Sequence, residues 1–456
     1  MVEPSGRARL AYCSPLPPQA TGIADYSAEL LPRLADRFEI ELFTSRGCRP
    51  PRELAKRFPV RRLATLSDAR GFDAVVYHVG NNVAMHRQIY ETALEVPGIV
   101  VLHEFMLHHL IRELSFERGE DEYLEQMRHC YGAGGYTTGK RFLKLGAARD
   151  LWAYPMFERI VDRSLGIVVH NETARRRIAA SRPAAHVEVV PHFLPGSPGP
   201  ERRDAVTLRR DLGLPERGLL VASFGFLSEA KRLEVALRAF ARFRHQHSEA
   251  CFLLVGDDRR HPGLPALLDS ELGQCVIRTG RVSDQRFTDY MRATDLALNL
   301  RYPTGGESSG TLLRLMGLGK AVVVSDTGSF AELPEGCCAR VAVDRGEEDQ
   351  LLALLLTLAD DPTLREELGR HARAYVEREH SMARCLDRWT EAILGIAEAK
   401  SVPAQPVPPL AATEPGDVAS RLIDVVAAGL EDLGVAGEDD ELVDGIARKL
   451  IDLRLN

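Results

Sequence analysis

The residues best suited to chemistry lie in a segment rich in glycine and hydroxyl side chains, at 299–320. A buried strand is predicted to end there, Gly305 and Gly306 turn the chain, and a helix is predicted to begin near Ser309. Free amide groups in the first turn of a helix bind anions such as a diphosphate. Glu307 stands beside that positive helix end, where it is suited to accept hydrogen bonds from sugar hydroxyls. The simpler alternative is that Glu307 caps the helix.

Two further loops follow predicted strands and could reach the same ligand. Gly22 lies in the first loop, where it would let the backbone approach an anion at the start of the next helix. In the second loop, Gly225 is followed by Lys231 and Arg232, which are expected at the start of a helix. The helix dipole disfavours cations there, so a lysine makes more sense opposite an anion. The alternative is a solvated basic pair.

Short apolar runs alternating with helical patterns are expected to position these loops. Strands are predicted at 9–16, 38–44, 73–79, 99–103, 166–170 and 187–192, and then at 219–225, 251–256, 276–279, 296–300 and 321–326. This alternation predicts parallel sheets covered by helices on both faces. Two such sheets facing one another would place the carboxyl ends of their strands on a shared cleft, the usual ligand site of doubly wound folds.

A chain of 456 residues exceeds what one hydrophobic core organises. We predict an N-terminal domain at 1–198, completed by a helix near 378–398, and a C-terminal domain at 199–377, with a hinge at 195–200. A linker rich in proline and alanine at 401–416 leads to an acidic helical tail at 417–456. That tail is either a docking or oligomerisation hairpin or a loosely held extension.

Composition excludes several classes of protein. Eleven acidic and four basic residues after position 400 account for the whole net charge of −7, and a neutral body argues against nucleic-acid binding. The eight scattered cysteines predict reduced thiols rather than a metal site. The start of the chain lacks the apolar segment of a secretory signal, and no apolar run is long enough to cross a bilayer. We expect a cytoplasmic protein, with contact to the inner membrane face as a further expectation.

The order of the motifs resembles the retaining glycosyltransferases of family 4, of the group 1 type, which have the GT-B fold. The likeness covers residues 8–398. The matching motifs are Thr21-Gly22-Ile23, His103-Glu104, Val189-Val190-Pro191-His192, Gly225-Phe226 with Lys231, Val255-Gly256-Asp257, the segment 279–284, and Glu307-Ser308-Ser309-Gly310 followed by Arg314 and Gly319-Lys320-Ala321-Val322-Val323. The last of these is a variant of the family's E-x7-E motif.

The resemblance implies roles for individual residues. Lys231 would neutralise the donor diphosphate, Glu307 would hold a donor-sugar hydroxyl, and His103 would line the side of the acceptor and donor sugar. The other residues expected to bind the donor are Gly22, Gly225, Arg281, Val282, Ser308, Ser309, Gly310, Thr311 and Arg314. On the acceptor side we expect Glu104, the partner of His103 in its motif, and Asn82, which follows a predicted strand. His108 and His109 are interpreted as a helical surface pair.

Two departures from the family pattern bear on the donor. Phe226 stands where the family has an arginine that shares diphosphate binding with the lysine, and Arg314 stands where it has the second glutamate. Arg314 could therefore bring its positive charge to the phosphates and compensate for Phe226.

The function implied is retaining transfer of a hexose from a nucleotide-diphosphate sugar to a saccharide, lipid-linked or small-molecule acceptor, with no metal and no cofactor. An epimerase or phosphorylase would need a general acid or a pyridoxal lysine, and the sequence places neither. The alternative is a catalytically altered nucleotide-sugar-binding or scaffold protein whose helical tail mediates assembly. In either case a homo-oligomer formed through the C-terminal helices is a further expectation.

Overall fold

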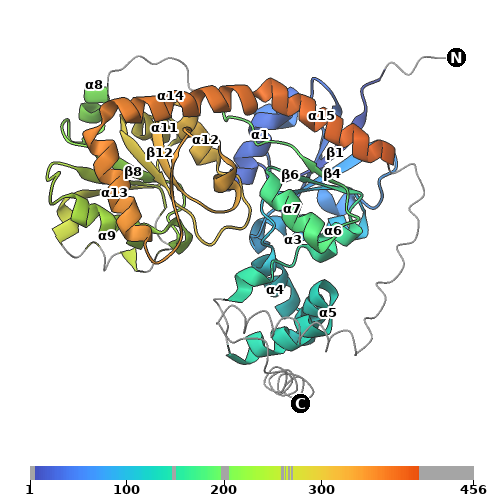
Figure 1. Ribbon diagram of the computed structural model, residues 1–456. Helices are drawn as coiled ribbons and strands as arrows, with labels where there is room; N and C mark the ends of the chain where they lie inside the picture. Colours follow the sequence, from blue (N-terminus) through green and yellow to red (C-terminus); the bar gives the residue numbers. More distant parts are fainter. Residues whose placement is uncertain are drawn as a thin grey trace, which may run out of the picture. The chain divides into compact units, whose positions relative to one another are not determined.

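The computed structural model describes residues 6–145, 150–196, 205–257 and 271–399, together with 261, 263, 264 and 268 (Figure 1). The predicted linker at 401–416, the acidic tail at 417–456, the domain boundary at 198 and most of the predicted hinge lie outside these residues. Within them the chain forms two parallel β-sheets, one of seven strands and one of six.

The first sheet has the strand order β3-β2-β1-β4-β5-β6-β7. Its strands are β1 (Arg9–Cys13), β2 (Glu39–Thr44), β3 (Val60–Arg62), β4 (Ala74–Val79), β5 (Ile99–Leu102), β6 (Gly166–Val169) and β7 (Val187–Val189). The helices of this part are α1 (Gly22–Leu34), α2 (Arg52–Arg57), α3 (Val83–Glu95), α4 (His108–Phe116), α5 (Glu120–Leu145), α6 (Glu158–Arg163) and α7 (Glu172–Ser181), with 3-10 turns at Leu63–Thr65 and Asp150–Ala153.

The second sheet has the order β10-β9-β8-β11-β12-β13. Its strands are β8 (Leu220–Phe224), β9 (Cys251–Val255), β10 (Val276–Gly280), β11 (Leu296–Asn299), β12 (Ala321–Ser325) and β13 (Ala339–Val341). The helices are α8 (Ala205–Asp211), α9 (Leu233–Phe243), α11 (Asp284–Ala293), α12 (Gly310–Gly317), α13 (Glu347–Asp360), α14 (Pro362–Glu379) and α15 (Met382–Ala399), with 3-10 turns at Glu229–Lys231, Glu271–Gln274 and Gly328–Glu332.

The inner strands of both sheets are buried on both faces, as parallel sheets require, whereas the edge strand β3 is exposed. Along β1, Leu10 and Tyr12 belong to one apolar cluster while Ala11 and Cys13 belong to the other, because successive side chains of a strand point to opposite faces. In each sheet the strand order reverses direction at the strand that comes first in the chain. In the first sheet β1 lies between β2 and β4, and in the second sheet β8 lies between β9 and β11. Ligands of such sheets bind outside the carboxyl ends of the strands at this reversal. The predicted class of two doubly wound α/β domains is confirmed.

The last two described helices run in succession from the second sheet to the first (Figure 1). Val376 of α14 packs in the core of the second domain, whereas Trp389 of α15 is fully buried in the first. The indole of Trp389 donates a hydrogen bond of 3.0 Å to the hydroxyl of Tyr26. A β-carbon on Gly166 would lie 2.7 Å from Ile396, so the glycine of β6 lets α15 approach the sheet closely.

Helices α4 and α5 form a part of the first domain that the strand pattern did not predict. His108, at the start of α4, is completely buried, so its interpretation as a surface residue is wrong. Its Nδ1 donates to the carbonyl of Tyr154 at 2.6 Å, and its Nε2 accepts from the hydroxyl of Tyr123 at 2.9 Å. Burial lowers the pKa of His108 to about 4. Its neighbour His109 is exposed. Among the described residues, no helix has both the length and the apolar character needed to span a bilayer.

Candidate functional site

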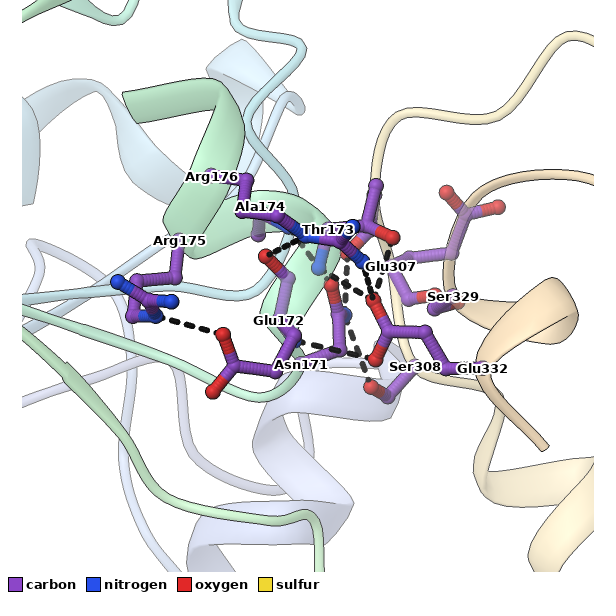
Figure 2. Close-up of polar contacts among 11 residues, drawn as sticks. Asn171, Glu172, Thr173, Ala174, Arg175, Arg176, Glu307, Ser308, Ser329 and Glu332 are labelled. Atoms are coloured by element: carbon purple, nitrogen blue, oxygen red, sulfur yellow. Dashed lines mark hydrogen bonds and ion pairs between the residues drawn. The ribbon is translucent and has the colours of Figure 1, made fainter. Parts of the chain in front are cut away.

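The candidate site lies where the loop after β11, here called the donor loop (residues 301–309), meets the loops after β5 and β6. The amide of Phe105 donates to the carbonyl of Gly305 at 2.7 Å. Asn171, shown in Figure 2, donates from Nδ2 to the carbonyl of Gly306 at 2.8 Å. Gly306 has a positive φ of 77°, and a β-carbon there would lie 2.3 Å from the ring of Phe105. The two glycines are therefore required for the domains to approach this closely.

The side chain of Asn171 forms hydrogen bonds both to its own helix α7 and to the donor loop. Its Oδ1 accepts from the amide of Ala174 at 2.9 Å and so caps α7, while its Nδ2 also donates to Ser308 Oγ at 3.2 Å (Figure 2). Sequence analysis did not select Asn171. The signal was present, because an asparagine directly after a predicted strand is a common helix cap at the edge of the sheet where ligands bind.

A carboxylate of the second domain reinforces the start of the same helix. Glu332 accepts hydrogen bonds from the amides of Glu172 and Thr173, the first of them at 3.1 Å, and from the hydroxyl of Thr173 (Figure 2). Arg176 lies 3.6 Å from the same carboxylate. A negative charge at the amino end of a helix is favoured by the free amides and the helix dipole. Glu332 therefore acts as a contact between the two domains.

Glu307 is held by its own loop. Its Oε2 accepts from Thr304 Oγ1 at 3.0 Å and from the amide of Gly305 at 2.8 Å, while its Oε1 lies 3.2 Å from Nε of Arg301. The helix that follows is capped by Ser309, whose Oγ accepts from the amide of Leu312 at 3.2 Å. The expectation that a helix begins near Ser309 is confirmed. The alternative that Glu307 caps it is wrong, because its carboxylate turns back onto the loop.

Lys231 is buried, with 4% of its surface exposed, and its Nζ donates to the carbonyl of Phe224 at 2.8 Å. No carboxylate among the described residues lies within 4 Å of its ammonium group. Burial lowers its pKa well below the usual value, the positive charge of Arg301 lowers it further, and Glu307 opposes the shift. Taking an ammonium group out of water without a counter-ion is unfavourable. An anion at this position would remove that penalty.

Lys231 and its neighbour Arg232 lie directly before α9, close to the helix start that the sequence predicted. Lys231 ends the 3-10 turn Glu229–Lys231, and Arg232, with a φ of 56°, stands between that turn and α9. Arg232 forms an ion pair with Glu347, so the two basic residues serve different partners.

Three of the predicted donor-binding residues line one space. A β-carbon on Gly225, which has a φ of 98°, would lie 3.7 Å from both Lys231 Nζ and Thr311 Oγ1. Thr311 belongs to the first turn of α12, where Gly310 begins the helix. The ammonium group and a hydroxyl group of the first turn of α12 thus both lie close to the bare glycine. This is an arrangement that suits a phosphate.

His103 lies in a chain of hydrogen-bonded imidazoles. His170 Nδ1 donates to the carbonyl of Val190 at 2.8 Å, so its Nε2 must accept from His103 Nδ1, at 3.3 Å. His103 Nε2 in turn accepts from His78 Nδ1 at 2.9 Å. Burial lowers the pKa of His170 to about 4 and that of His103 well below its usual value, so the chain is neutral. Both ring nitrogens of His103 are therefore engaged within the protein.

Glu104 borders the donor loop from the first domain. Its Oε1 accepts from the amide of Asn81 at 3.0 Å, and a β-carbon on Gly305 would lie 3.3 Å from its Oε2. Burial, and then the negative charge of Glu307, raise the pKa of Glu104 to about 7, against the hydrogen bond from Asn81 and the charge of Arg301. The structure therefore brings this predicted acceptor-side carboxyl group close to the predicted sugar-binding one.

Arg314 lies in a different part of the interface. Its Nη2 is 3.6 Å from Oε1 of Glu29 on α1, and both side chains line a cavity of about 220 Å³. The remaining lining residues come from the segment after β7 and from α11 and α12: Leu194, Pro195, Gly196, Asp284, Gln285, Thr288, Met291, Gly317 and Leu318. Burial and the negative charge of Asp284 raise the pKa of Asp25 on α1. The positive charge of Arg281 lowers that pKa, so Arg281 lies near these residues.

The remaining predicted residues are placed as follows. Gly22 begins α1 and has open space where a β-carbon would be, and Val282 packs against the core of the second domain. Asn82 precedes α3 as an exposed residue with no capping hydrogen bond from its side chain. Apart from Asn171 and Glu332, sequence analysis missed Arg301 and Glu29. In the part of the chain that the structure describes, no group of three or more histidine, cysteine or acidic residues could hold a metal ion.

Comparison with known proteins agrees with this geometry. The model of the family described as "Glycosyl transferases group 1" matches residues 218–361, within the second domain. A GDP-mannose-dependent monoacylated alpha-(1-6)-phosphatidylinositol monomannoside mannosyltransferase of Corynebacterium glutamicum is 28% identical over 42% of this chain and 50% of its own length. A D-inositol 3-phosphate glycosyltransferase of Acidothermus cellulolyticus is 29% identical over 42% of this chain and 44% of its own. The chain thus spans about half the length of the curated relatives it matches.

Two solved structures extend the likeness to the whole described fold. HepE of Anabaena, solved in complex with UDP, superposes with a TM-score of 0.58 at 16% identity, over 85% of this chain and 100% of that one. A sucrose-phosphate synthase from Thermosynechococcus elongatus gives a TM-score of 0.61 at 15% identity, over 86% of this chain and 100% of its own. The chain therefore has the GT-B fold, with two Rossmann-like domains.

Proposed function

We propose that this protein is a glycosyltransferase that moves a hexose from a nucleotide-diphosphate sugar to a saccharide, lipid-linked or small-molecule acceptor, with retention of the anomeric configuration. The observation that carries the proposal is the buried ammonium group of Lys231. It lacks a carboxylate partner among the described residues and faces the same space as Gly225 and the first turn of α12. The names of the curated relatives and the UDP bound to a structural neighbour support the same class of ligand.

The chemistry follows from where charge develops. When the bond between the anomeric carbon and the phosphate oxygen breaks, its electron pair stays on the departing diphosphate. Lys231 and the free amides at the start of α12 are fixed in place to stabilise that anion, and one such donor contributes about 3–4 kcal/mol in comparable sites. In the retaining route that the resemblance implies, the acceptor attacks from the side that the diphosphate leaves, and the leaving group takes the acceptor's proton.

The cavity beside Arg314 is the natural place for the nucleoside. It opens next to α12, whose first turn would hold the diphosphate, and it presents the carboxylates of Glu29 and Asp284. A carboxylate is the usual acceptor for ribose hydroxyls in doubly wound folds. Because Arg314 replaces the glutamate expected there, Glu29 of the first domain would take over that contact, which makes nucleoside binding depend on both domains.

Thermal-shift screening against UDP, GDP, ADP and TDP and their common sugars tests the donor class, since a ligand that binds the native state raises the melting temperature. The nucleotide identified is then tested for donor hydrolysis and for transfer to saccharide, lipid-linked and small-molecule acceptors. We expect one nucleotide diphosphate to stabilise the protein and its sugar to be turned over. A protein indifferent to every nucleotide would refute the proposal.

A second candidate is a nucleotide-sugar-binding protein that has lost catalysis. The replacement of the family's arginine by Phe226, which is 56% exposed, and of its second glutamate by Arg314 favours this alternative. The two candidates differ in one measurement: the binding protein would be stabilised by a nucleotide sugar without hydrolysing or transferring the sugar.

A further inference from the structure

The diphosphate site of the proposed function has one fewer cation than the family pattern implies, because Phe226 carries no charge. Sequence analysis offered Arg314 as its replacement. In the structure Arg314 lies beside Glu29 and lines the cavity next to α1. Another arginine, Arg301, lies near Lys231, because the amide of its neighbour Tyr302 donates to the carbonyl of Ala230 at 2.8 Å.

Arg301 begins the donor loop, directly after the buried Leu300. Its backbone amide donates to Ser325 Oγ at 2.9 Å, which ties the residue to the end of the neighbouring strand β12. Its side chain is 19% exposed. The backbone of Arg301 is thus fixed at the carboxyl ends of two adjacent strands, β11 and β12.

The hydrogen-bonding capacity of this guanidinium group is largely unused. Its Nε lies 3.2 Å from Glu307 Oε1, yet it is buried without a well-aligned hydrogen bond. No described residue accepts a hydrogen bond from its two Nη groups. Unlike Nε, the two Nη groups are not buried, so they can donate hydrogen bonds to a ligand that approaches from solvent.

The charges around Arg301 leave an excess of positive charge. Arg301 and Lys231 are close enough that the first lowers the pKa of the second, and Glu307 is the carboxylate that acts on Lys231 in the opposite direction. The other carboxyl group nearby, that of Glu104, has a pKa raised to about 7 and is therefore largely uncharged below neutral pH. Two cations facing one carboxylate favour the binding of an anion.

We propose that Arg301 is the second cation of the diphosphate site and takes the role that the family gives to the residue at position 226. This inference rests on the proposed function. As the bond to the anomeric carbon breaks, the electron pair passes to the diphosphate oxygen, and the Nη groups of Arg301 stabilise that charge together with Lys231. A guanidinium group can bind phosphate with two parallel hydrogen bonds, whereas an ammonium group acts as a point charge. Because Nε of Arg301 faces Glu307, the same side chain links the leaving group to the carboxylate that would hold the sugar.

The test compares the nucleoside diphosphate and the monophosphate of the nucleoside found by screening. Both ligands are titrated into the parent, Arg301→Gln, Arg301→Lys, Arg314→Gln and the control Arg238→Gln. Arg238 is exposed on α9, where it pairs with Glu348. The quantity compared is the ratio of the two dissociation constants. Binding of the monophosphate shows that the nucleoside site is folded, so the ratio isolates the contribution of the second phosphate.

We expect Arg301→Gln to weaken diphosphate binding about 10- to 100-fold, the range for a charge-assisted hydrogen bond, with a much smaller effect on the monophosphate. Arg301→Lys should keep part of the preference for the diphosphate over the monophosphate. Arg314→Gln should weaken both ligands alike, and Arg238→Gln should match the parent. If Arg301→Gln binds neither ligand, Arg301→Lys decides: this variant keeps the positive charge, so a complete loss of the preference for the diphosphate in a variant that still binds the monophosphate overturns the proposal.

A parental ratio in Arg301→Gln, or a collapse of the ratio in Arg314→Gln, would show that the second cation lies elsewhere. A parent protein that binds neither ligand would instead count against the proposed function. The failure of the inference and the failure of the function are therefore distinguishable.

Discussion

Asn171 of the first domain donates a hydrogen bond of 2.8 Å to the carbonyl of Gly306 in the donor loop of the second. The other end of the same amide group caps α7. One side chain therefore joins the start of a helix in one domain to the loop of the other that would hold the donor sugar. The position of the donor loop depends on the approach of the two domains.

Replacing Asn171 should separate these two roles. Asn171→Asp keeps an oxygen that caps α7 but loses the donors to Gly306 and Ser308. We expect close to parental thermal stability with transfer reduced about tenfold, since each lost hydrogen bond contributes on the order of 1 kcal/mol. Asn171→Ala should also lose about 1 kcal/mol of unfolding free energy through the missing cap. Equal activity of the parent and Asn171→Asp would show that the contact does not position the loop.

The carboxylate of Glu332 should hold the domains together at α7. Glu332→Ala removes three hydrogen bonds to Glu172 and Thr173, so we expect a larger radius of gyration in solution scattering and faster proteolysis between the domains. The exposed Glu335 provides a matched control, because it lies three residues further along the chain. If Glu332→Ala and Glu335→Ala have the same radius of gyration, the contact of Glu332 with the start of α7 does not hold the two domains together.

Glu104 should make stability depend on pH. Its pKa is raised to about 7 in the folded protein, so the protonated form is favoured by folding, and that contribution is full below the unfolded value and is lost as pH rises through 7. Glu104→Gln, which stays neutral, should therefore gain melting temperature relative to the parent between pH 5 and pH 8. The exposed Glu113 on α4 serves as the control in Glu113→Gln. If the melting temperatures of the parent and of Glu104→Gln depend on pH in the same way, the raised pKa of Glu104 beside Glu307 is contradicted.

Transfer should not require a metal ion, because Lys231, Arg301 and the amides of α12 would supply the positive charge. We expect activity to survive dialysis against EDTA and to be unchanged when magnesium or manganese is added. Activity lost with EDTA and restored by a divalent cation would refute this.

The fold could be predicted from the sequence because the buried strands are continuous apolar runs. The three-residue strand β3 was missed, since all of its side chains are exposed and it lacks that signal. For α4 the sequence indicated only a helical pair at His108 and His109, and α5 was missed; it is interrupted at Gly132, which has a φ of 65°.

The site could be predicted in part, for a physical reason. Residues that follow parallel strands converge at one edge of the sheet, so Lys231 and Glu307 could be selected from their positions, whereas Glu104 was selected through the resemblance of His103-Glu104 to a family motif. Sequence position does not give the direction of a side chain. Arg301 lies in the donor loop and Arg314 in the helix that follows it, and only the structure shows which of them lies near Lys231. The contact between Glu332 and Thr173 joins residues 159 positions apart, which no local pattern reveals.

The central claim is that the buried ammonium group of Lys231 stabilises a departing diphosphate, and one comparison tests it directly. Lys231→Met removes a buried ammonium group and Lys320→Met a half-buried one, and each of these groups donates to a backbone carbonyl. Lys320 precedes β12 and therefore lies at the opposite end of the sheet from the site. The measurement is the rate of sugar transfer or donor hydrolysis at saturating donor, after both variants are shown to be folded by circular dichroism. We predict a loss of about 100-fold or more for Lys231→Met and a far smaller loss for Lys320→Met. Near-parental turnover in Lys231→Met would contradict the account.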